Sequence, residues 1–123
     1  MNASIAVQVL PKVDSDQEVI RVVDEVIAYI KSTGLNYFVG PCETSIEGDY
    51  DELMDIVKEC QKVAIKAGAK SVSAYVKINY RPEGEVLTIE EKVTKHHYLY
   101  MVCICHCGDF NIVADGLFCG AGG

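Results

Sequence analysis

The strongest constraint on the fold is the order in which strand-like and helix-like hydrophobic periods follow one another in the first 80 residues. Apolar residues recur at helical spacing over residues 19–30 and 53–67, which predicts two amphipathic helices. Four extended segments flank them, and strands are predicted at residues 4–10, 36–39, 42–47 and 71–80. This β-α-β-β-α-β order predicts an α+β, ferredoxin-like fold, in which two helices cover one face of a four-stranded antiparallel sheet.

Capping and turn residues support these boundaries. Ser15 with Glu18, and Asp49 with Glu52, have the spacing of a helix-capping box, so each pair is predicted to start a helix. Gly40-Pro41 predicts the turn between the second and third strands. A short further helix is predicted over residues 88–95.

Charge and hydropathy exclude several classes of partner. Among 123 residues, 18 acidic side chains outnumber 11 basic ones, and the formal net charge is −7. No basic stripe is available to bind nucleic acid or an anionic membrane surface. No apolar run approaches the roughly 20 residues of a membrane span. Residues 1–10 lack the features of a signal peptide, so a cytoplasmic protein is expected.

The cysteines divide the chain into two predicted parts. Four of the six lie after residue 102, so residues 1–95 are predicted to form the domain and residues 96–123 a Cys-rich extension. Cys103, Cys105 and Cys107 have a CxCxC spacing that differs from the CxxC knuckles of zinc sites, and no metal is assigned. A soft-metal or redox site, an extra edge strand or loosely packed extension, and an altered reading frame remain alternatives.

No set of catalytic residues is visible in the sequence. It contains no glycine-rich phosphate loop, nucleophile elbow or HExxH motif. The acidic residues around Asp51 lie at a predicted helix start, where negative charge is favourable without a metal. A protein that is not an enzyme and that needs no cofactor is therefore expected.

Several short motifs resemble one known family. Residues 39–41, Thr44 and residues 46–49, which read VGP, T and IEGD, resemble the signature of the thiamine-binding protein family, also called UPF0045. The resemblance extends over about residues 3–95 and includes residues 66–70 and 87–93. It implies a small cytoplasmic ferredoxin-like protein that forms dimers or tetramers through its sheets and binds thiamine or the hydroxymethylpyrimidine part of thiamine.

Candidate ligand-binding residues follow from that implied ligand. An aminopyrimidine needs hydrogen-bonding partners for its edge and an aromatic or acidic environment for its ring and for the attached cation. Side chains of these kinds occur on the predicted strands, and the candidates are Gln8, Tyr37, Thr44, Ser45, Glu47 and Tyr75. Strand alternation places Ser45 and Glu47 on the face that the helices leave uncovered. Thr44 could instead stabilise a turn, and Glu47 could instead favour a helix start.

The predicted function is therefore non-catalytic binding of thiamine or hydroxymethylpyrimidine by a homo-oligomer. Two alternatives remain at this point. One is a structural or regulatory oligomer without a small ligand, in which the uncovered sheet face only makes subunit contacts. The other is a metal or redox role of the Cys-rich extension.

Overall fold

A computed structural model of the chain describes residues 1–96, 111–112 and 118–119. The chain divides into two compact units, Met1–Val86 and Leu87–Gly123. The division predicted at residue 95 falls inside the second unit. No helix in the described part of the chain is long and apolar enough to cross a membrane.

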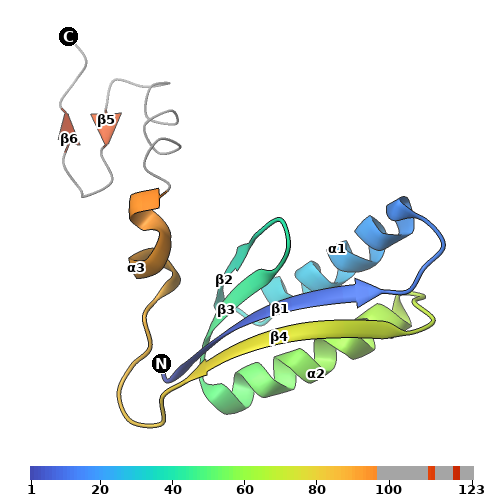
Figure 1. The fold of residues 1–123 in the computed structure, drawn as a ribbon, viewed down its shortest axis with the longest axis horizontal. Helices are drawn as coiled ribbons and strands as arrows, with labels where there is room; N and C mark the ends of the chain where they lie inside the picture. The colour runs from blue at the N-terminus through green and yellow to red at the C-terminus, as the bar shows by residue number, and fades with distance from the viewer. Residues whose placement is uncertain (97–110, 113–117, 120–123) are drawn as a thin grey trace. The chain divides into compact units, whose positions relative to one another are not determined.

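The first unit contains the six predicted elements in the predicted order (Figure 1). They are β1 (Ala3–Pro11), α1 (Asp16–Ser32), β2 (Asn36–Val39), β3 (Thr44–Gly48), α2 (Tyr50–Lys66) and β4 (Val72–Tyr80). The strands form one sheet in the order β2-β3-β1-β4, and all neighbouring pairs are antiparallel. Both helices lie against one face of this sheet. The predicted ferredoxin-like α+β fold is therefore confirmed.

The two helices start in different ways. The Ser15 hydroxyl accepts a hydrogen bond of 3.2 Å from the backbone N–H of Glu18, as the capping-box spacing predicts. Asp49 occupies the N-cap position of α2, as predicted, but its side chain makes no capping hydrogen bond. Asn2 Oδ1 accepts the N–H of Tyr50 instead, at 2.9 Å. The cap comes from the far end of the chain because β1 pairs with β3, and this pairing brings the N-terminus beside the start of α2.

The core lies between the sheet and the two helices. Ile5 and Val7 of β1 and Ile46 of β3 supply its sheet side. The helices contribute apolar residues at helical spacing: Val22, Val26 and Ile30 from α1, and Leu53, Ile56, Cys60 and Ala64 from α2. Because these side chains are almost completely buried, their removal from water is the main stabilising term of the unit.

The second unit begins with the predicted short helix. This helix, α3 (Ile89–Val93), starts at Thr88, whose hydroxyl accepts the N–H of Glu91 at 3.0 Å. A single 3-10 turn, Thr94–His96, follows α3. The strands β5 (Asn111–Ile112) and β6 (Phe118–Cys119) pair antiparallel with each other. Cys103, Cys105 and Cys107 lie outside the described residues.

We expect a chain truncated after Lys95 to unfold in one cooperative transition. Within residues 1–96, every buried apolar residue lies at or before Val86, so the truncation removes none of them. Urea melts of the full and truncated chains, followed by circular dichroism, test this prediction. A broad transition in the truncated chain would show that residues 96–123 contribute to the core.

The two cysteines of that truncated chain should differ sharply in reactivity. Cys42 is exposed, whereas Cys60 is completely buried, and burial raises the pKa of its thiol from 9.0 to about 11. A thiol reagent at about pH 8 should therefore label one site rapidly and the second only on unfolding, since the thiolate is the reactive form. The same shift stabilises the fold below pH 9.0, and this contribution should be lost as the pH rises toward about 11. Rapid labelling of both thiols in the native protein would contradict the burial of Cys60.

Candidate functional site

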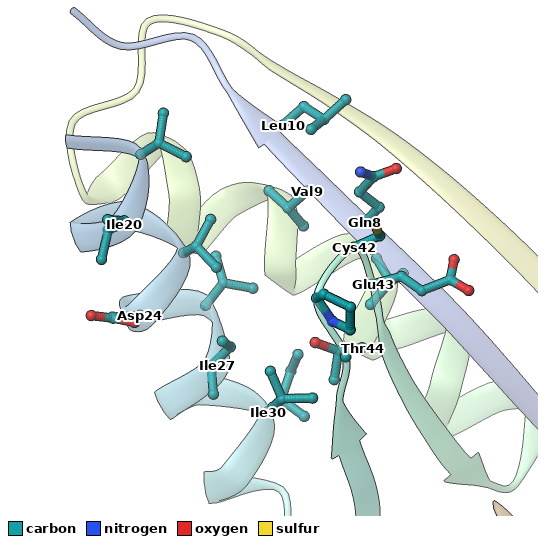
Figure 2. Close-up of a pocket in the computed structure, with 17 residues that line it drawn as sticks. Gln8, Val9, Leu10, Ile20, Asp24, Ile27, Ile30, Cys42, Glu43 and Thr44 are labelled. Carbon is teal, nitrogen blue, oxygen red and sulfur yellow. The ribbon is translucent and has the colours of Figure 1, made fainter. Parts of the chain in front are cut away.

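A cleft of about 340 Å³ lies on the helix-covered side of the sheet, between α1, β1 and the loop that joins β2 to β3 (Figure 2). Ligand sites in proteins typically measure about 300–1,000 Å³, so the cleft has the size of a small-molecule site. Three segments line it: residues 7–10 of β1; Val19, Ile20, Val23, Asp24, Val26, Ile27 and Ile30 of α1; and residues 39–44.

The cleft exists because β3 is shorter than β1. The two strands pair only from Ala3↔Gly48 to Val7↔Thr44, whereas β1 continues to Pro11 and pairs there with β4 alone. Beyond Val7, the position beside β1 is taken by the loop 40–43 in place of a strand. The sheet is therefore narrower at this end, and the apolar side of α1 there faces a hollow.

The loop 40–43 has a defined conformation. The N–H of Gly40 donates to the carbonyl oxygen of Glu43 at 2.9 Å. A Cβ atom at position 40 would lie 2.9 Å from the same oxygen, so this tight turn requires glycine. The Glu43 carboxylate lies 2.8 Å from Lys77 Nζ, and this ion pair ties the loop to β4 across β1.

The walls of the cleft are mostly apolar, and Thr44 places one hydroxyl among them. Thr44 is only 7% exposed, and its hydroxyl is directed toward α1 (Figure 2). In the described residues, every fully buried side-chain oxygen has a hydrogen-bond partner. No hydrogen bond is found for the Thr44 hydroxyl, so this oxygen is not fully buried. The hydroxyl therefore keeps access to the cleft, where it can donate one hydrogen bond and accept others.

The opposite face of the sheet is uncovered by the helices and carries a second group of predicted residues. We call it the open face, and the strand register places on it Ser4, Ala6, Gln8, Leu10, Asn36, Phe38, Ser45, Glu47, Ser73, Tyr75, Lys77 and Asn79. Glu47 accepts a hydrogen bond of 2.5 Å from Asn36 Nδ2 on the neighbouring strand, and its exposure is 7%. Tyr75 lies beside Gln8 and is 66% exposed.

The structure thus separates the six predicted ligand-binding residues. Gln8, Ser45, Glu47 and Tyr75 lie on the open face, as strand alternation indicates. Thr44 and Tyr37 share the helix-covered face with Ile46. Of the six residues, Thr44 and Gln8 line the cleft, whereas Tyr37 does not. Tyr37 packs against the hydrophobic core.

Sequence reasoning did not identify the α1 wall of the cleft. Val23 and Ile27 have the spacing of ordinary core residues, and nothing in that spacing distinguishes a cleft wall from a core face. The one sequence signal for the cleft was the Gly40-Pro41 turn, which predicts a loop between β2 and β3. In the structure, this loop lies beside the end of β1, where a longer β3 would have continued the sheet. In the described part of the chain, no group of three or more His, Cys, Asp or Glu residues is arranged to hold a metal ion.

Comparisons with known proteins agree with the resemblance in the motifs. The family model for thiamine-binding proteins matches residues 5–97. A UPF0045 protein from Clostridium perfringens is 45% identical over 93 residues, which make up 76% of this chain and 95% of that protein.

Solved structures with the same fold include two with substantial sequence identity. A domain of unknown function (DUF77) from Bacillus cereus has a TM-score of 0.70 and 38% identity, with 78% of this chain and 90% of that chain covered. A candidate thiamine biosynthesis/salvage protein from Thermotoga maritima has a TM-score of 0.68 and 36% identity, with 78% and 99% covered. From its sequence and its fold, this chain belongs to the thiamine-binding protein family.

Proposed function

We propose that the cleft between α1 and β1 binds thiamine, or its hydroxymethylpyrimidine part, without converting it chemically. The observation that carries this proposal is the Thr44 hydroxyl, for which no hydrogen bond is found in the described residues and which lies on the wall of a mostly apolar cleft. Membership of the thiamine-binding family, and a T. maritima neighbour assigned to thiamine biosynthesis or salvage as a candidate, support the same ligand class.

The chemistry of the cleft suits a flat heterocycle. Valine and isoleucine side chains of β1 and α1 offer apolar contact to the faces of a ring. The Thr44 hydroxyl offers one donor and two acceptor sites to a ring nitrogen or an exocyclic amino group. An apolar site with a few placed polar groups is the common form of small-molecule sites.

Binding without catalysis is favoured by what lines the cleft. Its lining contains two carboxylates, those of Asp24 and Glu43, and no histidine. Glu43 is paired with Lys77. General acid–base catalysis needs a positioned donor and acceptor near the reacting bond, and this lining offers no matched pair.

The open face is a second candidate for the same ligand, and Glu47 is the specific reason. Its carboxylate is largely buried on a face made of strands alone and already holds Asn36 in place. An aminopyrimidine could donate to such a carboxylate. Gln8, Ser45 and Tyr75 would then complete the site.

Substitution of Thr44 should distinguish the two positions. We expect Thr44→Val to weaken binding of thiamine or hydroxymethylpyrimidine about three- to tenfold, the usual effect of losing one neutral hydrogen bond. Thr44→Ser should retain most of the affinity. Titration calorimetry with both ligands and a thiazole control measures these changes.

The Glu47→Gln variant provides the opposite case in the same experiment. A site on the open face predicts that Glu47→Gln loses about ten- to hundredfold in affinity while Thr44→Val is unaffected. That result would move the site away from the cleft. If the unmodified protein binds none of the ligands, the structural or regulatory oligomer becomes the better explanation.

The open face is also proposed as the contact between copies in a homodimer or homotetramer. It presents Leu10 and Tyr75, which are 42% and 66% exposed, among polar residues, so it is a mixed surface of the kind found at subunit contacts. The implied assembly mode of the family agrees with this proposal.

A charge placed at the centre of that contact should dissociate the oligomer. Tyr75→Glu is expected to shift the sedimentation mass toward the 13.5 kDa of one chain, because an unpaired charge would have to be buried. Ile65→Glu provides the matched control, since Ile65 is an exposed apolar residue on α2. A monomer before substitution, or equal dissociation in both variants, would contradict an interface on the open face.

A further inference from the structure

The main chain of β1 is hydrogen-bonded to its two neighbouring strands in alternation. In an antiparallel sheet, the N–H and C=O of one residue point to the same neighbour, and the next residue of an inner strand points to the other. At one end of β1, the Arg81 N–H donates to the Asn2 carbonyl at 2.8 Å. At the other end, the Lys12 N–H donates to the Ser71 carbonyl at 2.8 Å. The even-numbered residues of β1 therefore point to β4, and the odd-numbered residues point to β3.

The turn between β2 and β3 gives the same assignment. The Gly40 N–H donates to the Glu43 carbonyl at 2.9 Å, so odd-numbered residues here point to β2 and Thr44 points to β1. Thr44 is the partner of Val7, and the pairing of β1 with β3 stops at this pair. Val9 is the next residue of β1 whose N–H and C=O point to the β3 side, and β3 does not extend that far.

The cleft wall thus carries an unused pair of main-chain groups. Among the described residues, no main-chain hydrogen bond joins the loop 40–43 to β1, and neither the N–H nor the C=O of Val9 has a partner on this side. Val9 lines the cleft together with Gln8 and Leu10, whose side chains point to the open face. These two neighbours therefore contribute main chain to the lining. Val9 adds one free donor and one free acceptor that point in the same direction.

We infer that the main chain of Val9 recognises the amino edge of the pyrimidine, so that the cleft is specific for a ring with an amino group next to a ring nitrogen. This inference rests on the proposed function and names the part of the ligand that the cleft recognises. The ring nitrogen accepts the Val9 N–H, and the amino group donates to the Val9 carbonyl. The ligand thereby takes the place of the missing strand partner.

The position of Thr44 is compatible with this contact. Thr44 is paired with Val7, and two residues along a strand span about 6.8 Å. A substituted six-membered ring is of this size, so a ligand held at Val9 lies within reach of the Thr44 hydroxyl. The apolar side chains of α1 and β1 then contact the faces of the ring.

Calorimetric titration of the full chain with hydroxymethylpyrimidine and one analogue tests this inference. In the analogue, a methyl group replaces the amino group. The methyl group has a similar size but cannot donate, so the Val9 carbonyl would be covered by the ligand and left unpaired. We expect the analogue to bind about ten- to hundredfold more weakly. Equal affinity for the two compounds would overturn the inference.

Two proline substitutions locate the contact. Val9→Pro removes a donor that takes no part in the strand pairing, and Pro11 already occupies the equivalent position two residues further on. We expect this variant to unfold cooperatively and to bind hydroxymethylpyrimidine about tenfold more weakly. Ala74→Pro is the matched control, because Ala74 is the β4 partner of Val9 and its N–H points to the outer edge of the sheet. It should retain the affinity.

Amide hydrogen exchange of the unmodified chain, measured by NMR, keeps the inference testable if Val9→Pro fails to fold. In the ligand-free protein, the Val9 amide should exchange much faster than the amides of Gln8 and Leu10, which point to β4. Slow exchange of all three amides would show that Val9 is already paired, and this would overturn the inference.

The outcomes for the inference and for the proposed function are distinct. Equal weakening by Val9→Pro and Ala74→Pro would assign the effect to a general disturbance of the strand pair and overturn recognition by Val9. Unchanged binding by Val9→Pro would overturn it as well, and in both cases the ligand-binding function would stand. Failure of both thiamine and hydroxymethylpyrimidine to bind the unmodified chain would overturn the inference and the proposed function together.

Discussion

The burial of one face of β1 is the constraint on which the rest of the structure depends. β1 and β3 are the two inner strands of the sheet, and β1 is the longer, with nine residues against five. Ile5 and Val7 of β1 pack beneath the helices. Its pairing with β3 also brings Asn2 to the start of α2. Because side chains alternate along a strand, burying one face of β1 also fixes which residues form the open face.

The cleft is a consequence of unequal strand lengths around β1. β4 accompanies β1 over its full length, but β3 pairs with it only as far as Val7. A loop with a glycine turn fills the remaining edge less completely than a strand would, and the hydrophobic side of α1 stays partly uncovered there. Apolar residues that build the core, such as Val26 and Ile30, thus also build the walls of the cleft.

The Glu43–Lys77 ion pair connects the two candidate functional surfaces. Glu43 lies in the loop that borders the cleft, whereas Lys77 lies on the open face beside Ala6. A second copy seated on the open face would lie close to this pair. The proposed ligand cleft and the proposed subunit contact are therefore linked by this ion pair.

The order and the faces of the elements could be predicted from the sequence, because hydrophobic period and capping residues are local signals. Ser15 illustrates this success, since its partner is only three residues away. The cap of α2 could not be predicted, because Asn2 is 48 residues away from Tyr50 and becomes its partner only through strand pairing. The candidate site residues were chosen from the sequence by residue type and strand alternation. Strand alternation placed Ser45 and Glu47 on the open face, but the position of Thr44 on a cleft wall depends on where β3 ends beside β1.

The sequence by itself determined the ferredoxin-like order, the family and the kinds of side chain that the strands present, because each of these is encoded in short segments. Only the tertiary structure decided that Thr44 lines a cleft, that Glu47 holds Asn36 on the opposite face, and that Val9 has no strand partner on the side of that cleft. The physical reason is that a cleft is a property of the space left between elements. That space depends on where β3 ends beside β1, and on how α1 packs across it.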